Sequence, residues 1–313
     1  MRKQVLVTGG AGFIGSHLSR RLLADGFHVV SIDNLSTGSL ENVPSGAEFI
    51  QRDLTREDAL RDAPRGPYVA VCHLAGQSSG EKSFENPLYD FDANTRSTLW
   101  LAQWALKHRV SVFLHASSMG VYGQTGPGPV SEAATPRPVS YYGASKYSAE
   151  QILQIASREG LRSCSFRMFS VYGPGQDLAE MRQGMVSIYL AYLLKGEPLV
   201  VRGSLERTRD FVYVDDVVEA WARAIEQPVS GALNLASGHG TTVRSLIAQL
   251  LTACGLDERY PVKEEAATPG DQHGLYADIT AIHDALGWEP RVTLREGLAR
   301  MVAWARSLHG VEA

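Results

Sequence analysis

Short apolar runs alternate with longer segments of helical spacing through the first half of the chain. Strands are predicted over residues 5–7, 28–32, 69–74, 110–114 and 162–169. Between and after them, apolar positions three and four apart predict helices over residues 13–23, 97–106 and 142–156. Strands that alternate with helices indicate βαβ units, in which helices cover both faces of a parallel sheet. The pattern therefore predicts an α/β fold built on a doubly wound parallel sheet.

The pattern becomes less regular after residue 171. Helices are predicted over residues 185–195 and 293–307, and the polar, proline-rich stretch 123–140 is predicted to form one long surface loop. We expect the first domain to span residues 1–168, with a segment near 209–238 returning to it, and a smaller mixed lobe to span residues 169–313. A crevice between two lobes is the natural place for a ligand.

The composition is that of an ordinary globular protein, with 313 residues of which 44% are hydrophobic and 20% charged. Lys and Arg number 30 against 34 Asp and Glu, which gives a formal charge of −4, and no basic block stands out. The chain therefore lacks the electrostatic footprint of a nucleic-acid-binding protein. No apolar run approaches the roughly 20 residues that span a bilayer. We expect neither a nucleic acid nor a membrane as a partner.

The three cysteines, Cys72, Cys164 and Cys254, stand far apart and form no CxxC pair. This spacing suggests neither a zinc site nor a disulfide framework, and no metal is expected. The apolar run at residues 5–7 is too short for the hydrophobic region of a signal peptide. Together these features predict a cytoplasmic protein in a reducing compartment.

Three glycines follow the first predicted strand and open the first helix. Gly9, Gly12 and Gly15 have the spacing of a dinucleotide-binding turn, which needs a tight bend, close approach of the backbone to a pyrophosphate and close helix–sheet packing. Free N–H groups at the helix N-terminus favour the phosphates. Asp33 ends the second strand, where a carboxylate can bind both ribose hydroxyls and repel a 2′-phosphate. The turn predicts a Rossmann-type sheet that binds a dinucleotide, and Asp33 favours NAD over NADP. The alternative is that Asp33 is only a turn or cap residue.

Tyr142 and Lys146 lie four residues apart, so both side chains fall on one face of their predicted helix. An ammonium beside a phenol, together with a positively charged nicotinamide, lowers the pKa of the tyrosine and makes it a plausible general base. Tyr141 is a poor competitor, because the residue four after it is Ser145. Ser118 follows a predicted strand at the edge where such sheets bind ligands, and its hydroxyl can hydrogen-bond a reacting oxygen. The alternative for Ser118 is a serine-rich turn.

These motifs, in this order and at these separations, resemble those of the extended short-chain dehydrogenases/reductases, in the nucleotide-sugar epimerase and dehydratase family. The resemblance covers nearly the whole chain. Its landmarks are residues 8–15, 33–38, 53–54, 73–76, 94, 117–118, 121–123, 142–146, 172–175, 209–211, 214–216, 269–271 and 277–278.

The resemblance implies tightly held NAD, a nucleotide diphosphate sugar in the C-terminal lobe, and a homodimer built from the helices near 97–106 and 142–156. It implies catalysis by Ser118, Tyr142 and Lys146. The residues expected at the cofactor, besides Tyr142 and Lys146, are Gly9, Gly12, Phe13, Ile14, Gly15, Asp33, Asn34, Ser36, Thr37, Gly38, Asp53, Leu54, Leu74, Ala75, Gly76, Asn94 and Phe169. The residues expected at the substrate are Gln77, Ser118, Met119, Gly120, Tyr142, Ser170, Arg182, Arg209 and Asp271.

The segment after Ser118 separates the branches of this family. Members that remove water or carbon dioxide usually carry an acid there, which protonates the leaving hydroxyl, whereas this chain has Met119 and Gly120. The pattern is similar to the 4-epimerase branch and implies NAD-dependent 4-epimerisation of a UDP-hexose, UDP-hexuronate or UDP-N-acetylhexosamine through a transient 4-keto intermediate. The alternatives are a dehydratase, decarboxylase or 4-ketosugar reductase on the same scaffold, or a non-catalytic NAD-binding sensor.

Two positions depart from the family pattern. Ser170 stands where the family commonly has an asparagine that contacts the diphosphate, and Thr268 stands where it commonly has an arginine. Four cations could replace the lost contact, namely Arg182, Arg202, Arg207 and Arg209. The first three can also be interpreted as solvated surface residues. Leu275 is of intermediate size and does not decide between a hexose and an N-acetylhexosamine.

Overall fold

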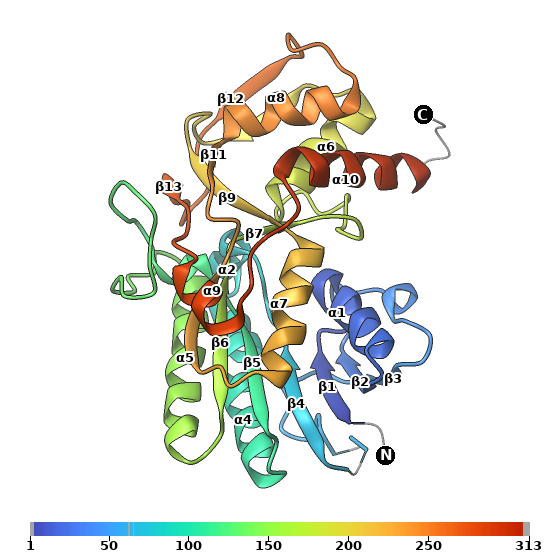
Figure 1. The fold of residues 1–313 in the computed structure, drawn as a ribbon. Helices are drawn as coiled ribbons and strands as arrows, with labels where there is room; N and C mark the ends of the chain where they lie inside the picture. Colours follow the sequence, from blue (N-terminus) through green and yellow to red (C-terminus); the bar gives the residue numbers. More distant parts are fainter. Residues whose placement is uncertain (1–2, 62, 65, 309–313) are drawn as a thin grey trace.

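A seven-stranded parallel sheet forms the centre of the larger lobe in the computed structural model, which describes residues 3–61, 63–64 and 66–308 (Figure 1). The strand order is β10-β6-β5-β4-β1-β2-β3, and every pair of neighbours is parallel. The strands are β1 (Gln4–Thr8), β2 (His28–Asp33), β3 (Glu48–Gln51), β4 (Tyr68–His73), β5 (Val112–Ser118), β6 (Ser163–Met168) and β10 (Gly231–Leu235). The predicted α/β fold with a Rossmann-type sheet is confirmed.

Helices cover both faces of this sheet, and the alternation along β1 shows why its apolar run is continuous. Val5 packs in one core with residues of α1 (Phe13–Ala24) and α7 (Val214–Glu226). Leu6 points to the opposite core, with Leu101 of α4 (Ser97–Lys107) and Leu153 of α5 (Tyr141–Arg158). Successive side chains of a strand point to opposite faces, so a strand covered on both sides must be apolar throughout.

The smaller lobe lies over one end of the parallel sheet (Figure 1). One of its sheets joins β7 (Ser170–Tyr172), β9 (Thr208–Tyr213), β11 (Gly240–Thr242) and β13 (Gly274–Leu275), and a second joins β8 (Leu199–Arg202) and β12 (Val262–Glu265). Its helices are α6 (Met185–Lys195), α8 (Val243–Cys254) and α10 (Leu294–Leu308). Among the helices of the described ranges, none is both long and apolar enough to cross a membrane.

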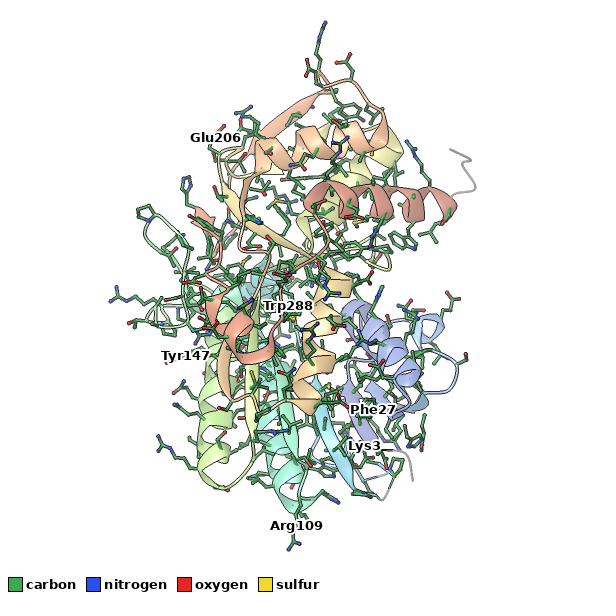
Figure 2. The ribbon with its side chains drawn as sticks, in the orientation of Figure 1. Lys3, Phe27, Arg109, Tyr147, Glu206 and Trp288 are labelled. Carbon is green, nitrogen blue, oxygen red and sulfur yellow. The ribbon has the colours of Figure 1, made fainter. Side chains whose placement is uncertain are left out.

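The remaining helical segments are short. They are η1 (Leu40–Asn42), α2 (Gly80–Glu85), α3 (Pro87–Phe91), the π-helical turn η2 (Asp92–Arg96), η3 (Met119–Val121) and α9 (Thr280–Leu286). Trp288 follows α9 and is labelled in Figure 2, where it lies between Glu206 at one end of the molecule and Arg109 at the other. Its indole N–H donates to the Asp216 carbonyl at 2.9 Å, which fixes the C-terminal segment to α7.

Predicted and observed elements differ at β5. This strand begins at Val112 rather than at residue 110, and it continues past residue 114 to Ser118. Its pairing with β6 extends to Ser118 and Met168, so Ser117 and Ser118 end the strand instead of following it. The helices predicted over 13–23, 97–106, 142–156, 185–195 and 293–307 are confirmed to within two residues at each end. The domain limits at residues 1 and 313 lie outside the described residues.

Candidate active site

The glycine turn after β1 is packed too tightly for side chains. Gly9 has a φ of +70°, and a Cβ there would lie 2.7 Å from the Ala75 amide nitrogen. A Cβ on Gly15 would overlap the Gly9 carbonyl. Gly12 is the N-cap of α1 and offers no side-chain cap, and the first turn of α1 contains no acid. The helix therefore presents backbone N–H groups and a partial positive charge, which suit the phosphates of a dinucleotide.

Asp33 is buried at the carboxyl end of β2, beside this turn. Its two oxygens accept from the Ala11 amide at 3.1 Å and the Leu35 amide at 2.8 Å, and Leu35 has a φ of +61°. The loop continues through Asn34, Ser36, Thr37 and Gly38, and a Cβ on Gly38 would lie 2.8 Å from the Ala11 backbone. The carboxylate is thus held in one orientation against the glycine turn.

Asp53 and Leu54 follow β3 at the same edge of the sheet. The Asp53 carboxylate accepts from the Thr55 amide at 2.9 Å, which is a turn contact. Leu54 is buried in the core beside Ile32. A role for Asp53 at the cofactor stays a prediction.

His73 ends β4 and is a packed structural residue. Its ring nitrogens lie 2.8 Å from the Thr8 hydroxyl and 3.1 Å from the Thr98 hydroxyl. Burial, with the charge of Lys146, lowers the pKa of His73 to about 3, so the ring is neutral at physiological pH. Leu74, Ala75 and Gly76 follow it, and the Ala75 amide donates to the Thr8 hydroxyl at 3.1 Å.

Asn94 and Lys146 meet against the backbone of Gly76. A Cβ on Gly76 would overlap Asn94 Oδ1 and lie 3.1 Å from Lys146 Nζ. Asn94 Oδ1 is buried and has no hydrogen-bond partner within the described ranges. A buried acceptor without a donor is costly. This orphaned oxygen, the glycine cradle and the uncapped N-terminus of α1 fit a bound dinucleotide.

Ser118, Tyr142 and Lys146 converge at the carboxyl end of β5. The Ser118 hydroxyl hydrogen-bonds the Tyr142 oxygen in the sense that favours the phenolate, and the Ser118 Oγ accepts from the Gly120 amide at 3.1 Å. Lys146 is 4% exposed, and its Nζ lies 5.9 Å from the centroid of the Tyr142 ring. Tyr141, by contrast, is exposed and packs its ring against Phe84. The geometry brings together the three residues that the sequence assigned to catalysis.

Burial dominates the protonation of this triad in the polypeptide alone. Burial raises the pKa of Tyr142 to about 12, and the Ser118 hydrogen bond offsets only part of that increase. Burial also lowers the pKa of Lys146 to about 8. In the polypeptide alone, loss of water around the phenol outweighs a lysine almost 6 Å from the centre of its ring. The expected lowering of the tyrosine pKa includes the charge of a bound nicotinamide and stays a prediction.

A buried ion pair behind the triad was missed by the sequence analysis. Arg167 on β6 donates Nε to Glu150 Oε1 at 3.0 Å and Nη2 to Oε2 at 2.8 Å, and the Ser117 hydroxyl donates to the same carboxylate. Glu150 lies four residues after Lys146 on α5. A glutamate on the buried face of a helix is the signal that could have revealed it.

A cavity of about 440 Å³ opens between the two lobes, a size typical of ligand sites. Predicted residues that line it are Phe13, Ile14, Ser118, Met119, Gly120, Tyr142, Phe169, Ser170, Arg182, Arg209 and Asp271. Gln77 is not among the lining residues. Its amide bonds Ser79 and Asp90 instead, so its predicted contact with substrate finds no support in this geometry.

Two buried arginines share one carboxylate in the cavity wall. Arg207 and Arg209 both pair with Asp271, the second at 2.8 Å. Burial and the neighbouring charge of Arg207 lower the pKa of Arg209 to about 10. Two guanidinium groups against one carboxylate leave a surplus positive charge, which favours an anionic ligand. The surface alternative for Arg207 is wrong, because the side chain is buried.

The other two candidate cations form ion pairs with α2. Arg182 pairs with Glu85, and Arg202 lies 3.5 Å from Glu81. Both arginine side chains are more than a third exposed, so these pairs are worth little energetically. Arg207 and Arg209 are therefore the better candidates for a phosphate contact.

Comparison with known proteins places these features in context. The model of the NAD dependent epimerase/dehydratase family matches residues 5–236. A UDP-glucose 4-epimerase of Mycolicibacterium smegmatis is 36% identical over 97% of this chain and 99% of its own length. The crystal structure of a UDP-glucose 4-epimerase with UDP-glucose from Thermotoga maritima has a TM-score of 0.94 and 37% identity, covering 98% of this chain and 99% of that one. The UDP-glucose 4-epimerase of Thermus thermophilus in complex with NAD has a TM-score of 0.89 and 36% identity, covering 97% and 99%.

Proposed function

Because this chain belongs to the NAD dependent epimerase/dehydratase family, we propose that it is an NAD-dependent nucleotide-sugar epimerase that inverts C4 of a UDP-hexose. Similarity over nearly the full length to two solved UDP-glucose 4-epimerases supports the nucleotide and the hexose. UDP-hexuronates and UDP-N-acetylhexosamines are the neighbouring substrates to test beside it.

The observation that carries the proposal is that, within the described residues, no unpaired acid lines the cavity beside the triad. Met119 and Gly120 follow Ser118 and cannot donate a proton. Among the described residues that line the cavity, the acids are Glu81 and Asp271, and each is paired with arginine. A dehydratase needs an acid for its leaving hydroxyl, whereas an epimerase needs only a base and a hydride acceptor.

The three catalytic residues have distinct roles in this proposal. Tyr142 takes the proton from the sugar O4 and later returns it, and Ser118 shares that proton through its hydrogen bond to Tyr142. Lys146 favours the phenolate through its positive charge. NAD, when bound, supplies the acceptor and donor of hydride for C4. The residues that would hold it are the glycine turn, Asp33, Asn94 and Lys146.

The substrate diphosphate is proposed to lie against Arg209 and Arg207. Both guanidinium groups are buried in the cavity wall, where a hydrogen bond to phosphate is strong. Arg207 would compensate for the threonine at position 268, and Ser170 lines the same cavity. We also propose that residues 1–168, with a returning segment near 209–238, form the domain that holds NAD. Residues 169–313 then mainly hold the sugar nucleotide.

The test is incubation of the purified protein with NAD and UDP-glucose, followed by NMR and mass spectrometry. The expected product is UDP-galactose of unchanged mass, and Tyr142→Phe should lower kcat by about 10²-fold or more, the range for a general base. Tyr141→Phe, next to it on the helix but exposed, is the matched control and should keep its rate. Loss of water or carbon dioxide, or full activity of Tyr142→Phe, would overturn the proposal.

We further propose that the enzyme is a homodimer joined through α4 and α5. These helices pack together and expose Leu99 and Ile155, and neighbouring α3 exposes Leu88 at 80% and Phe91 at 50%. Large exposed apolar side chains on neighbouring helices favour an interface with a second copy. Light scattering after gel filtration should give twice the chain mass, and Ile155→Glu should give monomers. A monomeric wild-type protein at micromolar concentration would contradict this arrangement.

A cytoplasmic location is likewise a proposal. Cys72, Cys164 and Cys254 are free and buried, as is usual in a reducing compartment. Fractionation of the source cells with an antibody to the protein would test it, and recovery outside the cytoplasm would refute it.

A further inference from the structure

Asp90 on α3 is a completely buried carboxylate beside the catalytic helix, with an exposed fraction of 0%. It accepts hydrogen bonds from Gln77 Nε2 at 2.6 Å, Asn94 Nδ2 at 3.3 Å and the Ser145 hydroxyl at 2.5 Å. Within the described ranges, no lysine or arginine nitrogen lies within 4.0 Å of it as an ion-pair partner. A buried carboxylate without a paired cation is costly, so its location needs a reason.

The orientation of Gln77 indicates that Asp90 carries a charge. Gln77 Oε1 accepts from the Ser79 amide, and its Nε2 donates to the Ser79 carbonyl at 2.8 Å. The amide nitrogen is thereby directed at Asp90 as a donor. The amide nitrogens of Gln77 and Asn94 both donate to Oδ1 of Asp90, while the Ser145 hydroxyl lies between Oδ2 and the Tyr142 carbonyl, 3.0 Å away. An ionised carboxylate is purely an acceptor and suits these amide donors. Burial raises the pKa of Asp90, while these donors and the charge of Lys146 oppose that increase.

Lys146 follows Ser145 on α5, and its Nζ lies beside Asn94, a donor to Asp90, against the backbone of Gly76. Burial disfavours the ammonium of Lys146, and the charge of Asp90 acts in the opposite direction. His73 of β4 and His115 of β5 also face this lysine, but burial lowers the pKa of both rings and leaves them neutral. Asp90 is therefore the anion whose negative charge offsets the positive charge of Lys146.

Other charged groups on the surrounding elements are committed to partners of their own. Glu150 of α5 pairs with Arg167, and Asp92 of η2 pairs with Arg96. The charged residues of α2 pair with residues outside it, as Glu81 with Arg202, Lys82 with Glu180, and Glu85 with Arg182. The remaining titratable neighbour is Tyr142, and the charge of Asp90 opposes its ionisation.

We propose that Asp90 is a positioning residue that keeps Lys146 in its charged form and thereby sets the pH range in which the site works. The effect on the reaction rests on the proposed epimerase function; the effect on Lys146 does not. Without the carboxylate, Lys146 loses its proton at lower pH, and Tyr142 ionises at lower pH as well. Both limbs of the pH profile of kcat/KM then move to lower pH.

The experiment compares wild type, Asp90→Asn and the control Asp92→Asn, all loaded with NAD. Asp92 lies two residues away with a part-exposed carboxylate and is no part of the site. We expect the basic limb of kcat/KM to fall by about one pH unit in Asp90→Asn, the lower range for a nearby charge, and to stay in place in Asp92→Asn. An equal profile in all three proteins overturns the proposal.

A second measurement separates Asp90 from the reaction itself. NMR of side-chain-labelled lysine, with the Lys146 signal assigned from Lys146→Met, gives its titration midpoint without any turnover. The midpoint should fall in Asp90→Asn and stay constant in Asp92→Asn. If Asp90→Asn does not fold, Asp90→Ser takes its place, and a wild-type midpoint below pH 7 by itself overturns the proposal. A protein that shows these midpoints but epimerises no UDP-sugar refutes the proposed function and leaves the role of Asp90 intact.

Discussion

Arg167 on β6 binds both oxygens of the Glu150 carboxylate on α5, at 3.0 and 2.8 Å. The pair is buried, and it lies one helical turn beyond Lys146. The Ser117 hydroxyl joins the same carboxylate from β5, directly beside Ser118. One ion pair thus connects the strand that carries Ser118 with the helix that carries Tyr142 and Lys146.

Removal of one partner of this pair should be strongly destabilising. Glu150→Ala leaves the Arg167 charge buried and uncompensated, and we expect a loss of about 3–5 kcal/mol in the free energy of unfolding. Urea denaturation followed by circular dichroism measures it. Glu159→Ala, at the exposed end of the same helix, should change the free energy by less than about 0.5 kcal/mol. Equal midpoints for the two variants would show that the pair has no structural role.

The glycine turn should tolerate no side chain at position 9. In Gly9→Ala the new Cβ would lie 2.7 Å from the Ala75 amide in a backbone of positive φ, so the turn must open and NAD content should fall at least tenfold. NAD released by heat from purified protein can be quantified by absorbance. Gly26→Ala is the control, because Gly26 also has positive φ, +87°, but no atom within 4 Å of the added Cβ. The prediction fails if both variants retain cofactor equally.

Arg209 should dominate the affinity for the nucleotide diphosphate. In Arg209→Lys the ammonium cannot reproduce a two-point contact, and the Kd for UDP should rise about tenfold or more. Isothermal titration calorimetry with UDP gives the Kd directly. Arg244→Lys alters an exposed arginine paired with Glu206 and should leave the Kd unchanged. An unchanged Kd in Arg209→Lys would place the diphosphate elsewhere.

Two buried histidines should make the protein sensitive to acid. Burial lowers the pKa of His73 to about 3 and that of His115 well below 6.5, so between those values the unfolded state binds more protons than the folded state. Stability is therefore complete above about pH 6.5 and is lost as the pH falls, by about 2 kcal/mol for His73 at pH 5.

Urea midpoints measured between pH 7.5 and 5 test this dependence. His73→Asn, which keeps a hydrogen-bonding side chain, should weaken the dependence of the urea midpoint on pH. His239→Gln, at an exposed position, should leave that dependence unchanged. A wild-type midpoint that does not change over this range would contradict neutral buried histidines.

The sequence predicted those features whose signals are local in the chain. The glycine turn needs eight consecutive residues, and Tyr142 and Lys146 are separated by one helical turn, so spacing alone placed them together. The alternation of strands and helices predicted the parallel sheet for the same reason. Met119 and Gly120 lie next to Ser118 in the sequence, and neither is an acid, so the sequence alone indicated an epimerase rather than a dehydratase.

Features that depend on contacts between distant segments were not predictable in this way. Asp90 reaches Ser145 across 55 positions, and nothing around it in the sequence marks it as buried. From the sequence, Arg207 could equally be a surface residue, because its ion pair with Asp271 joins segments that are 64 positions apart. The end of β5 was misjudged because its last pairs depend on β6, about 50 residues later.

The position of β10 has a consequence for the newly synthesised chain. This strand is the edge strand of the sheet beside β6, and α7 covers the face next to α1 (Figure 1). Both elements are made more than 40 residues after β6 ends at Met168. When β6 has just left the ribosome, the nascent chain therefore has an uncovered apolar face on its sheet, and the edge of β6 is unpaired. It cannot reach its final form until about residue 235 has left the exit tunnel, and over that interval it is a natural client for chaperones.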